Sequence, residues 1–228
     1  MRKLNASELQ AVQQSILKKE IYAVELLGEI YDHYLSHLEN LPEEKFDEEL
    51  EALDQKWTYA YCHKIQSELN KNIQKSIRST QWTLIKSYFS WPKMAFTLAL
   101  VGILTLLVNI LTWKMQVIIL FLVPLVYLVG FMLYITYRSR KKTKAIRTLF
   151  GNSGIRVRSV FSNHFTSYLT LPLHFYNVFL NLPRVFGLDK LVPDYLVNYL
   201  SVTCCFIVVI HSLSSYEAWK LKSKSAFV

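Results

Sequence analysis

The stretch MAFTLALVGILTLLVNILTW (residues 94–113) carries no charged residue over 20 positions. A helix needs about 20 apolar residues to cross the hydrocarbon core of a bilayer, which is about 30 Å thick. A second apolar stretch, MQVIILFLVPLVYLVGFMLYITY (residues 115–137), follows after Lys114 alone. The pair predicts a tight hairpin of two membrane-spanning helices, and Pro124 is expected to kink the second one.

Two further spans are predicted at residues 159–182 and 195–213. YLVNYLSVTCCFIVVIHSL (residues 195–213) is a third clear apolar stretch. The loop before residue 159 is rich in Lys and Arg and has no acid, and the end of the chain is basic too, so both are expected in the cytoplasm. Two cytoplasmic segments are separated by an even number of crossings, so residues 159–182 are predicted to cross as well. The basic residues expected to determine this topology, or to contact anionic lipid, are Arg138, Arg140, Lys141, Lys142, Lys144 and Arg147.

A polar row interrupts the apolar character of the third predicted span. Its members recur at steps of three and four residues and are Asn163, Ser167, Thr170, His174, Asn177 and Asn181. In a helix this spacing makes one continuous stripe, called the polar stripe below. Polar side chains at membrane depth are disfavoured against lipid, so we expect the stripe to face protein. Packing among the four spans, a seam to a partner or second copy, and a polar pathway are the three interpretations.

The first part of the chain has a different character. Residues 1–91 hold 14 acidic and 11 basic residues, whereas residues 92–228 hold 3 acidic and 15 basic ones, within a net charge of +9. This contrast predicts a soluble domain joined to a membrane domain. The basic residues flank apolar spans, which argues against nucleic-acid binding. Three cysteines without framework spacing argue against a disulfide scaffold, and MRKLNASELQ at the N-terminus lacks the apolar core of a signal peptide.

Helical periodicity predicts an all-α cytoplasmic domain of three helices over residues 1–79. The first covers residues 5–20 with Ser7 and Gln10 as a capping box, the second covers 23–39, and a long third helix starts near Asp47. An amphipathic helix over 80–92 is expected to lie in the membrane interface, before a membrane domain over 93–219 and a basic cytoplasmic tail over 220–228. The expected aromatic anchors at the interface are Trp82, Tyr88, Trp91, Trp113 and Trp219.

One row in the second predicted helix has metal-ligand spacing. Glu29, His33 and His37 fall at i, i+4 and i+8, and two histidines one turn apart can chelate zinc. The row lies on the polar face of an acidic helix, for which a solvated face is the usual explanation. We therefore predict no metal and no cofactor, with this row as the alternative.

Residues 9–74 resemble a known module. ILKKEIYAVELLGEIYDHYLSHLEN, then PEEKFDEELEAL, then KIQSELNKNIQ are similar to the HTH-associated α-helical signalling domain, or permease prefix domain, of bacterial membrane proteins. The matching pattern is an aliphatic, acidic helix with an Asp32–His33 step, a Glu-rich helix and a long helix into the membrane. YAYCHK stands where the family has a small-residue step. The resemblance implies a regulatory protein or a transporter prefix in the bacterial inner membrane, and it implies no catalytic residue.

The function expected from these features is that of a non-catalytic membrane adaptor. No HExxH, GxSxG, Gly-rich phosphate loop or Cys/His ligand set is present, so an enzyme is disfavoured. Transporters usually show internal repeats or charged residues at membrane depth, and the sequence pattern shows neither. A small oligomeric transporter, or an accessory subunit of one, is therefore the second choice and is kept as the alternative. The adaptor would regulate or assemble a membrane complex, with both termini in the cytoplasm. Its partners would be membrane lipids and a membrane protein or a second copy of the chain.

Overall fold

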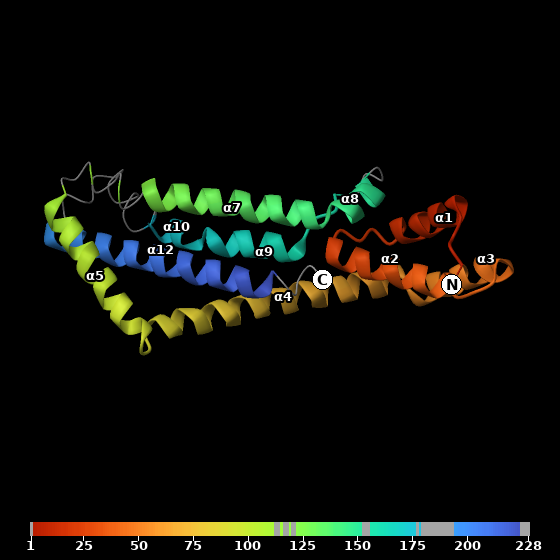
Figure 1. Cartoon of the computed structure of the whole chain (residues 1–228), viewed down its shortest axis with the longest axis horizontal. Coiled ribbons are helices and arrows are strands. Elements are labelled where there is room, and N and C mark those ends of the chain that lie inside the picture. Colours follow the sequence, from red (N-terminus) through yellow and green to blue (C-terminus); the bar gives the residue numbers. More distant parts are fainter. Residues whose placement is uncertain are drawn as a thin grey trace. The chain divides into compact units, whose positions relative to one another are not determined.

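A computed structural model describes residues 2–111, 115, 119, 122–151, 156–176, 178 and 194–223 (Figure 1). The described regular structure is helical, apart from one isolated parallel bridge between Ala23 and Arg158. The predicted all-α fold class is therefore confirmed for this part of the chain. Its elements are α1 (Ala6–Leu17), α2 (Val24–Leu38), the 3-10 turn η1 (Glu43–Lys45), α3 (Phe46–Lys56), α4 (Tyr59–Tyr88), α5 (Lys93–Ile110), α7 (Val123–Lys142), α8 (Lys144–Phe150), α9 (Val160–Leu169), α10 (Leu171–Tyr176) and α12 (Asp194–Lys222).

Helix α1 begins at a capping box that lies two residues before the predicted one. The Asn5 side chain accepts from the Glu8 backbone N–H at 2.9 Å, and the Glu8 carboxylate accepts from the Asn5 N–H at 2.8 Å. The predicted pair, Ser7 and Gln10, does not form the box, because Ser7 instead donates its hydroxyl to Asn5. Asn5 and Glu8 form the same kind of reciprocal cap that a Ser/Gln pair forms, and the helix begins at Ala6, one residue after the predicted start.

The predicted long third helix is two helices. Helix α3 ends at Lys56, and Trp57 leaves the helical region with φ −94° and ψ 62°. Helix α4 then starts beside Thr58, whose hydroxyl accepts from the Tyr61 N–H at 3.3 Å. Helix α4 continues for 30 residues to Tyr88, so most of the predicted interfacial helix over 80–92 is its last part (Figure 1). The apolar spacing stays in phase across Trp57, which is why the break is invisible in the periodicity.

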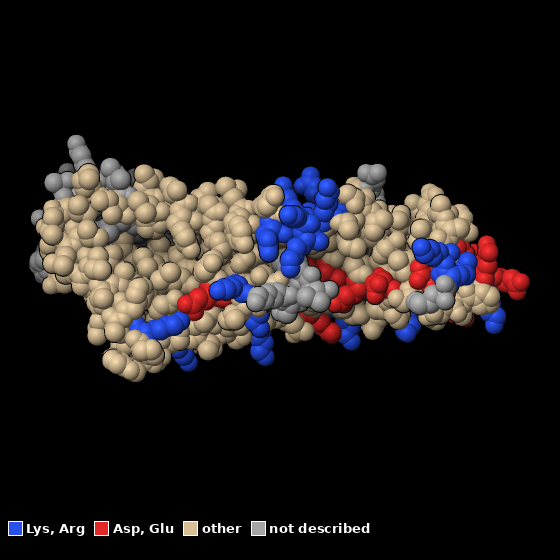
Figure 2. All heavy atoms as spheres, viewed as in Figure 1, with Lys and Arg blue, Asp and Glu red and all other residues tan. Residues whose placement is uncertain are grey.

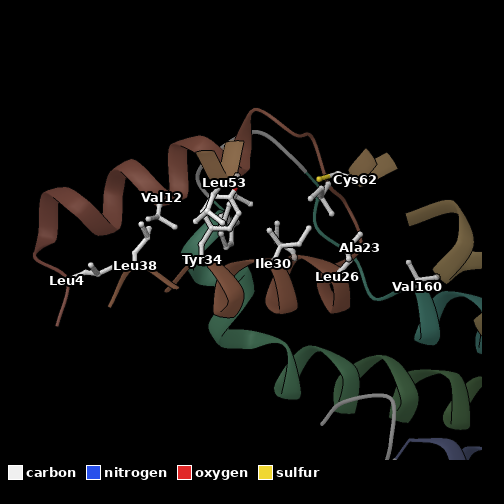
Figure 3. Packing of buried hydrophobic residues seen from close by; sticks show 14 of the residues in the cluster. Leu4, Val12, Ala23, Leu26, Ile30, Tyr34, Leu38, Leu53, Cys62 and Val160 are labelled. Atoms are coloured by element: carbon white, nitrogen blue, oxygen red, sulfur yellow. The ribbon is translucent and has the colours of Figure 1, made fainter. Parts of the chain in front are cut away.

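The first compact unit combines two distant parts of the chain, residues 1–75 and 137–163. Figure 3 shows its core around Tyr34, whose ring is fully buried among aliphatic side chains of α1, α2 and α3. Phe150 of α8 and Val160 of α9 belong to the same core. The unit therefore includes a segment from beyond the predicted domain over 1–79, because residues 137–163 complete its apolar core.

The second compact unit comprises residues 76–136 and 164–225, and its described helices meet on α12. Helices α5 and α10 pack along α12, and the buried contact with α5 consists of Leu104, Val108 and Cys205. The Phe131 ring of α7 lies 5.8 Å from that of Tyr216. Cys205 thus packs as a small apolar side chain within this unit.

Two described helices are long and apolar enough to span a membrane, judged by length and composition: Lys93–Ile110 and Asn198–Lys222. They overlap the predicted spans over 94–113 and 195–213. Helix α7 ends in a run of Lys and Arg, and much of the sequence before Val123 lies outside the described residues, as does most of 177–193. The predicted spans over 115–137 and 159–182 therefore stay predictions.

Candidate functional site

The best-defined polar site in the first unit is the place where α2 meets the start of α9. The Glu25 carboxylate accepts hydrogen bonds from the Ser159 hydroxyl at 2.5 Å and from the backbone N–H groups of Val160 and Phe161 at 3.1 and 3.3 Å. These N–H groups are among the orphan donors at a helix N-terminus, where the helix dipole also favours a negative charge. A side chain from α2 therefore caps a helix that starts 135 positions later.

Backbone pairing fixes the same junction. The Arg158 N–H donates to the Tyr22 carbonyl at 2.8 Å, and the Val24 N–H donates to the Arg158 carbonyl at 3.0 Å. The buried Gln66 side chain of α4 accepts from the N–H groups of Tyr22 and Ala23 at 3.0 and 3.1 Å. The loop before α2 is thus bonded to α4 on one side and to the residues before α9 on the other. We call these contacts, together with the Glu25 cap, the α2–α9 clasp.

Helix α8 docks beside the clasp through apolar contacts. The buried Phe150 ring meets Tyr31 of α2 edge-on, with 5.6 Å between ring centroids. Ile146 faces Gly28 so closely that a Cβ there would lie 3.7 Å from its side chain. Such ordinary van der Waals spacing shows that α2 and α8 approach closely at this point. The segment after α7 is therefore an integral part of the first unit's core.

A second polar site lies in the other unit, around His211 of α12. Pro172 has no N–H, so the Tyr168 carbonyl lacks the donor that a continuous helix would supply four residues later. The His211 Nε2 lies 2.9 Å from that carbonyl oxygen. A carbonyl can only accept, so Nε2 carries the proton and Nδ1 is left to accept from the Gln81 amide at 3.1 Å. The break between α9 and α10 is therefore bonded to α12 and, through it, to α4.

The same Gln81 amide also donates to the Ser215 hydroxyl at 2.9 Å. A further polar contact ties the end of α4 to α12: the Tyr88 hydroxyl donates to Glu217 at 3.0 Å, and Glu217 pairs with Lys93 at 3.1 Å. Burial, together with the neighbouring Glu217 carboxylate, raises the pKa of Tyr88 to about 12, so this hydroxyl stays protonated. Helix α4 is thus joined to α12 at two levels, and both contacts are polar.

The described part of the polar stripe lies mostly on the surface. Asn163, Ser167 and His174 are exposed and Thr170 is half-buried. Helix α9 ends at Leu169 and α10 begins at Leu171, so the predicted continuous rod is broken in the middle of the stripe. Asn177 and Asn181 lie outside the described residues. Which of the three interpretations of the polar stripe holds stays a prediction.

The other predicted site residues have different environments. Trp82 and Trp91 are exposed, whereas Tyr88 and Trp219 are buried against protein and Trp113 lies outside the described residues. The role of these residues as interface anchors stays a prediction. Of the predicted topology determinants, only Arg147 is half-buried, and it donates to the Thr143 hydroxyl at 2.9 Å. The exposed ones are Arg138, Arg140, Lys141, Lys142 and Lys144.

The three residues with metal-ligand spacing have separate neighbours. His37 pairs with Glu49 of α3 at 3.0 Å, and the His33 ring lies 5.5 Å from that of Trp57. Among the described residues, no group of three or more His, Cys, Asp or Glu side chains is arranged to hold a metal ion. Glu29, the third member of the row, is exposed.

Three residues at these sites were not singled out by the sequence: Glu25, Gln81 and His211. Glu25 is one of 14 acids in residues 1–91, and nothing local distinguishes it. His211 does have a signal, because it lies in an apolar stretch where polar side chains are costly. Comparison with known protein families, with curated proteins and with solved structures found no match.

Proposed function

We propose that the chain is an integral membrane protein in which a cytoplasmic helical domain, the first unit, regulates or assembles a membrane complex without catalysing a reaction. The α2–α9 clasp is the observation that carries this proposal. It bonds the N-terminal helices directly to the first turn of the helix that bears the polar stripe. A change in the domain that releases Glu25 would free the start of α9, and the stripe would then change its position or its order.

Exposed apolar surface supports the membrane part of the proposal. Only 17% of Lys93–Ile110 is buried, and Leu98, Leu106 and Ile110 are 64%, 62% and 76% exposed. Soluble proteins rarely expose a continuous apolar surface of this kind, whereas lipid would cover it. On this proposal the first unit lies in the cytoplasm, because it contains the basic residues that follow α7.

The continuity of the helices supports the regulatory part. Helix α4 contributes residues 59–75 to the first unit and residues 76–88 to the second, and α9 likewise contributes to both. In the second unit, Gln81 of α4 reaches His211, which in turn holds the Tyr168 carbonyl at the break after α9. The start of α9 is therefore bonded to α2 through Glu25, and its end is bonded to α12, which contacts α4 through Gln81. The resemblance of residues 9–74 to a regulatory prefix module agrees with this role.

Native isolation tests the proposal. The full-length chain, tagged at the C-terminus, is extracted in a mild detergent, and the proteins that accompany it are identified and quantified. We expect a stoichiometric membrane-protein partner whose recovery falls in Glu25→Ala and is unchanged in Glu29→Ala, the exposed acid one turn along α2. A pure homo-oligomer that moves a solute across liposomes would instead establish the transporter alternative.

A further inference from the structure

We propose that four exposed cations at the junction of α7 and α8 bind the phosphate-bearing headgroups of anionic lipids. They are Arg138, Arg140, Lys141 and Lys144, called the basic cluster below. Figure 2 shows Lys and Arg side chains gathered densely over this part of the molecule. The proposal rests on the membrane insertion proposed above. Of the two roles expected from the sequence, topology and lipid contact, it assigns lipid contact to these four residues.

The sequence of environments along α7 matches the depth profile of a membrane. Val126 and Leu133 are 63% and 66% exposed, and exposed Tyr134 and Tyr137 follow them. The basic cluster begins at the next residue. Apolar side chains favour the hydrocarbon, Tyr rings favour the interface, and Lys and Arg favour the headgroup layer. This order along one helix would bring the cluster to the level of the lipid phosphates.

The charge of the segment favours an anionic ligand. No acidic residue occurs between residues 138 and 158, and within the described structure no hydrogen bond or ion pair engages the side chains of the four cluster residues. The nearby Glu25 is already engaged by Ser159 and the start of α9. Burial lowers the pKa of Arg147, the neighbouring Arg140 lowers it further and Glu25 opposes the shift. The repulsion between Arg140 and Arg147 is one that a bound phosphate would relieve.

The rest of the segment holds the basic cluster in place. Phe150 is buried in the core of the first unit, Ile146 packs against that core, and Arg147 is bonded to Thr143. The apolar side of α8 is therefore committed to the domain, while Lys144 and the end of α7 remain exposed. Fixed cations lose less freedom on binding than cations on a disordered tail, which favours headgroup binding.

Lipid retention by the full-length chain tests the proposal. The protein is equilibrated in mixed micelles with equal amounts of phosphatidylglycerol and phosphatidylcholine, and the retained lipid is quantified by mass spectrometry. We expect the wild type to retain phosphatidylglycerol in preference to phosphatidylcholine, and the preference to fall as KCl is raised. Each cation near an anionic surface contributes on the order of fivefold, so R138Q/R140Q/K141Q/K144Q should reduce the preference by well over tenfold, and by about 600-fold if the four contributions multiply.

A matched variant separates the basic cluster from net charge. K18Q/K64Q/K71Q/K75Q removes four exposed cations from α4 and the end of α1 and should keep the preference. The cluster variant retains Lys142, Arg147, Arg156 and Arg158 to preserve topology, and the salt dependence of the wild type tests the proposal without any substitution. Three results would overturn the proposal. The two variants could lose the lipid preference equally, or the wild type could show no salt-sensitive preference. The cluster variant could also keep its lipid preference and lose only a bound acidic protein. Retention of neither lipid would instead overturn membrane insertion itself.

Discussion

Replacing Glu25 by Ala should loosen the start of α9 more than any other single change in α2. The substitution removes three acceptor contacts, to Ser159 Oγ and to the N–H groups of Val160 and Phe161. Loss of a helix cap costs about 0.5–2 kcal/mol, and loss of a negative charge beside a helix N-terminus costs about 0.3–1 kcal/mol more. We therefore expect a local cost of about 2 kcal/mol, which corresponds to roughly 30-fold in the opening equilibrium.

Hydrogen exchange of the full-length protein in nanodiscs measures this opening directly. The amides of the first turn of α9 should exchange about 30-fold faster in Glu25→Ala than in the wild type, since exchange reports local opening free energies. Glu25→Gln keeps an acceptor but loses the charge, so its effect should be about half as large in free energy. Glu29→Ala, an exposed acid on the same helix, should leave the rates unchanged. Unchanged exchange at Val160 and Phe161 in Glu25→Ala would refute the clasp.

Three further results are expected. His211→Leu leaves the Tyr168 carbonyl without its donor, which should lower the free energy of local opening at the α9–α10 break by about 1–3 kcal/mol. The amides around the break should therefore exchange faster. Asp54 of α3 pairs with Lys19 at 3.0 Å and accepts from the Tyr34 hydroxyl at 3.1 Å. Burial raises the pKa of Asp54, but its hydrogen bonds and the Lys19 ion pair outweigh burial and lower the pKa overall. The contribution of Asp54 to stability is therefore complete above about pH 4 and is lost as pH falls through the lowered value, which acid unfolding of the wild type and Asp54→Asn would show. Replacing His174 and Asn177 together by Leu should leave insertion intact and weaken co-purification of a partner or of other copies.

The stripe and His211 results each have a control on the same chain. Phe175→Leu with Phe179→Leu alters the same region without removing members of the polar stripe, and should weaken the association less. Thr203→Val removes a hydroxyl that bonds only within α12, to the Tyr199 carbonyl, and should leave the α9–α10 break unchanged. If the His174/Asn177 pair is neutral in association and function, the stripe serves packing within a single chain. If Asp54→Asn unfolds at the same acid pH as the wild type, the carboxylate does not set the acid limit.

Local elements of the fold were predictable because their signals are local. The apolar runs place α5 and α12, and the spacing of aliphatic residues places α1 and α2 to within a few residues. The break at Trp57 was not predictable, because the apolar positions of α3 and α4 stay in phase across it. The docking of α8 was also not predictable, since Phe150 finds Tyr31 from 119 positions away and no periodicity encodes such a contact.

The candidate sites divide in the same way. The polar stripe and the basic residues after α7 are visible as patterns, and the structure leaves most of their described members exposed. The capping role of Glu25 could not be predicted from the sequence, because it depends on the three-dimensional position of the N-terminus of α9. His211 is different: Pro172 creates an unpaired carbonyl at Tyr168, and a lone histidine in an apolar helix is a suitable donor. The sequence therefore indicates an acceptor at Tyr168 and a donor at His211, but it does not show that the two are in contact.

Labelling of single cysteines from one side of a membrane tests the central claim most directly. The first unit contains residues 1–75 and 137–163 in one core, so an inserted chain must hold both parts on the same side. Lys18→Cys and Ala145→Cys place thiols at exposed positions in the two parts, and the three native cysteines are buried. In sealed vesicles, a membrane-impermeant maleimide should label both variants from the cytoplasmic face and neither from the other face. Labelling of the two positions from opposite faces, or of both from both faces of intact vesicles, would contradict the account.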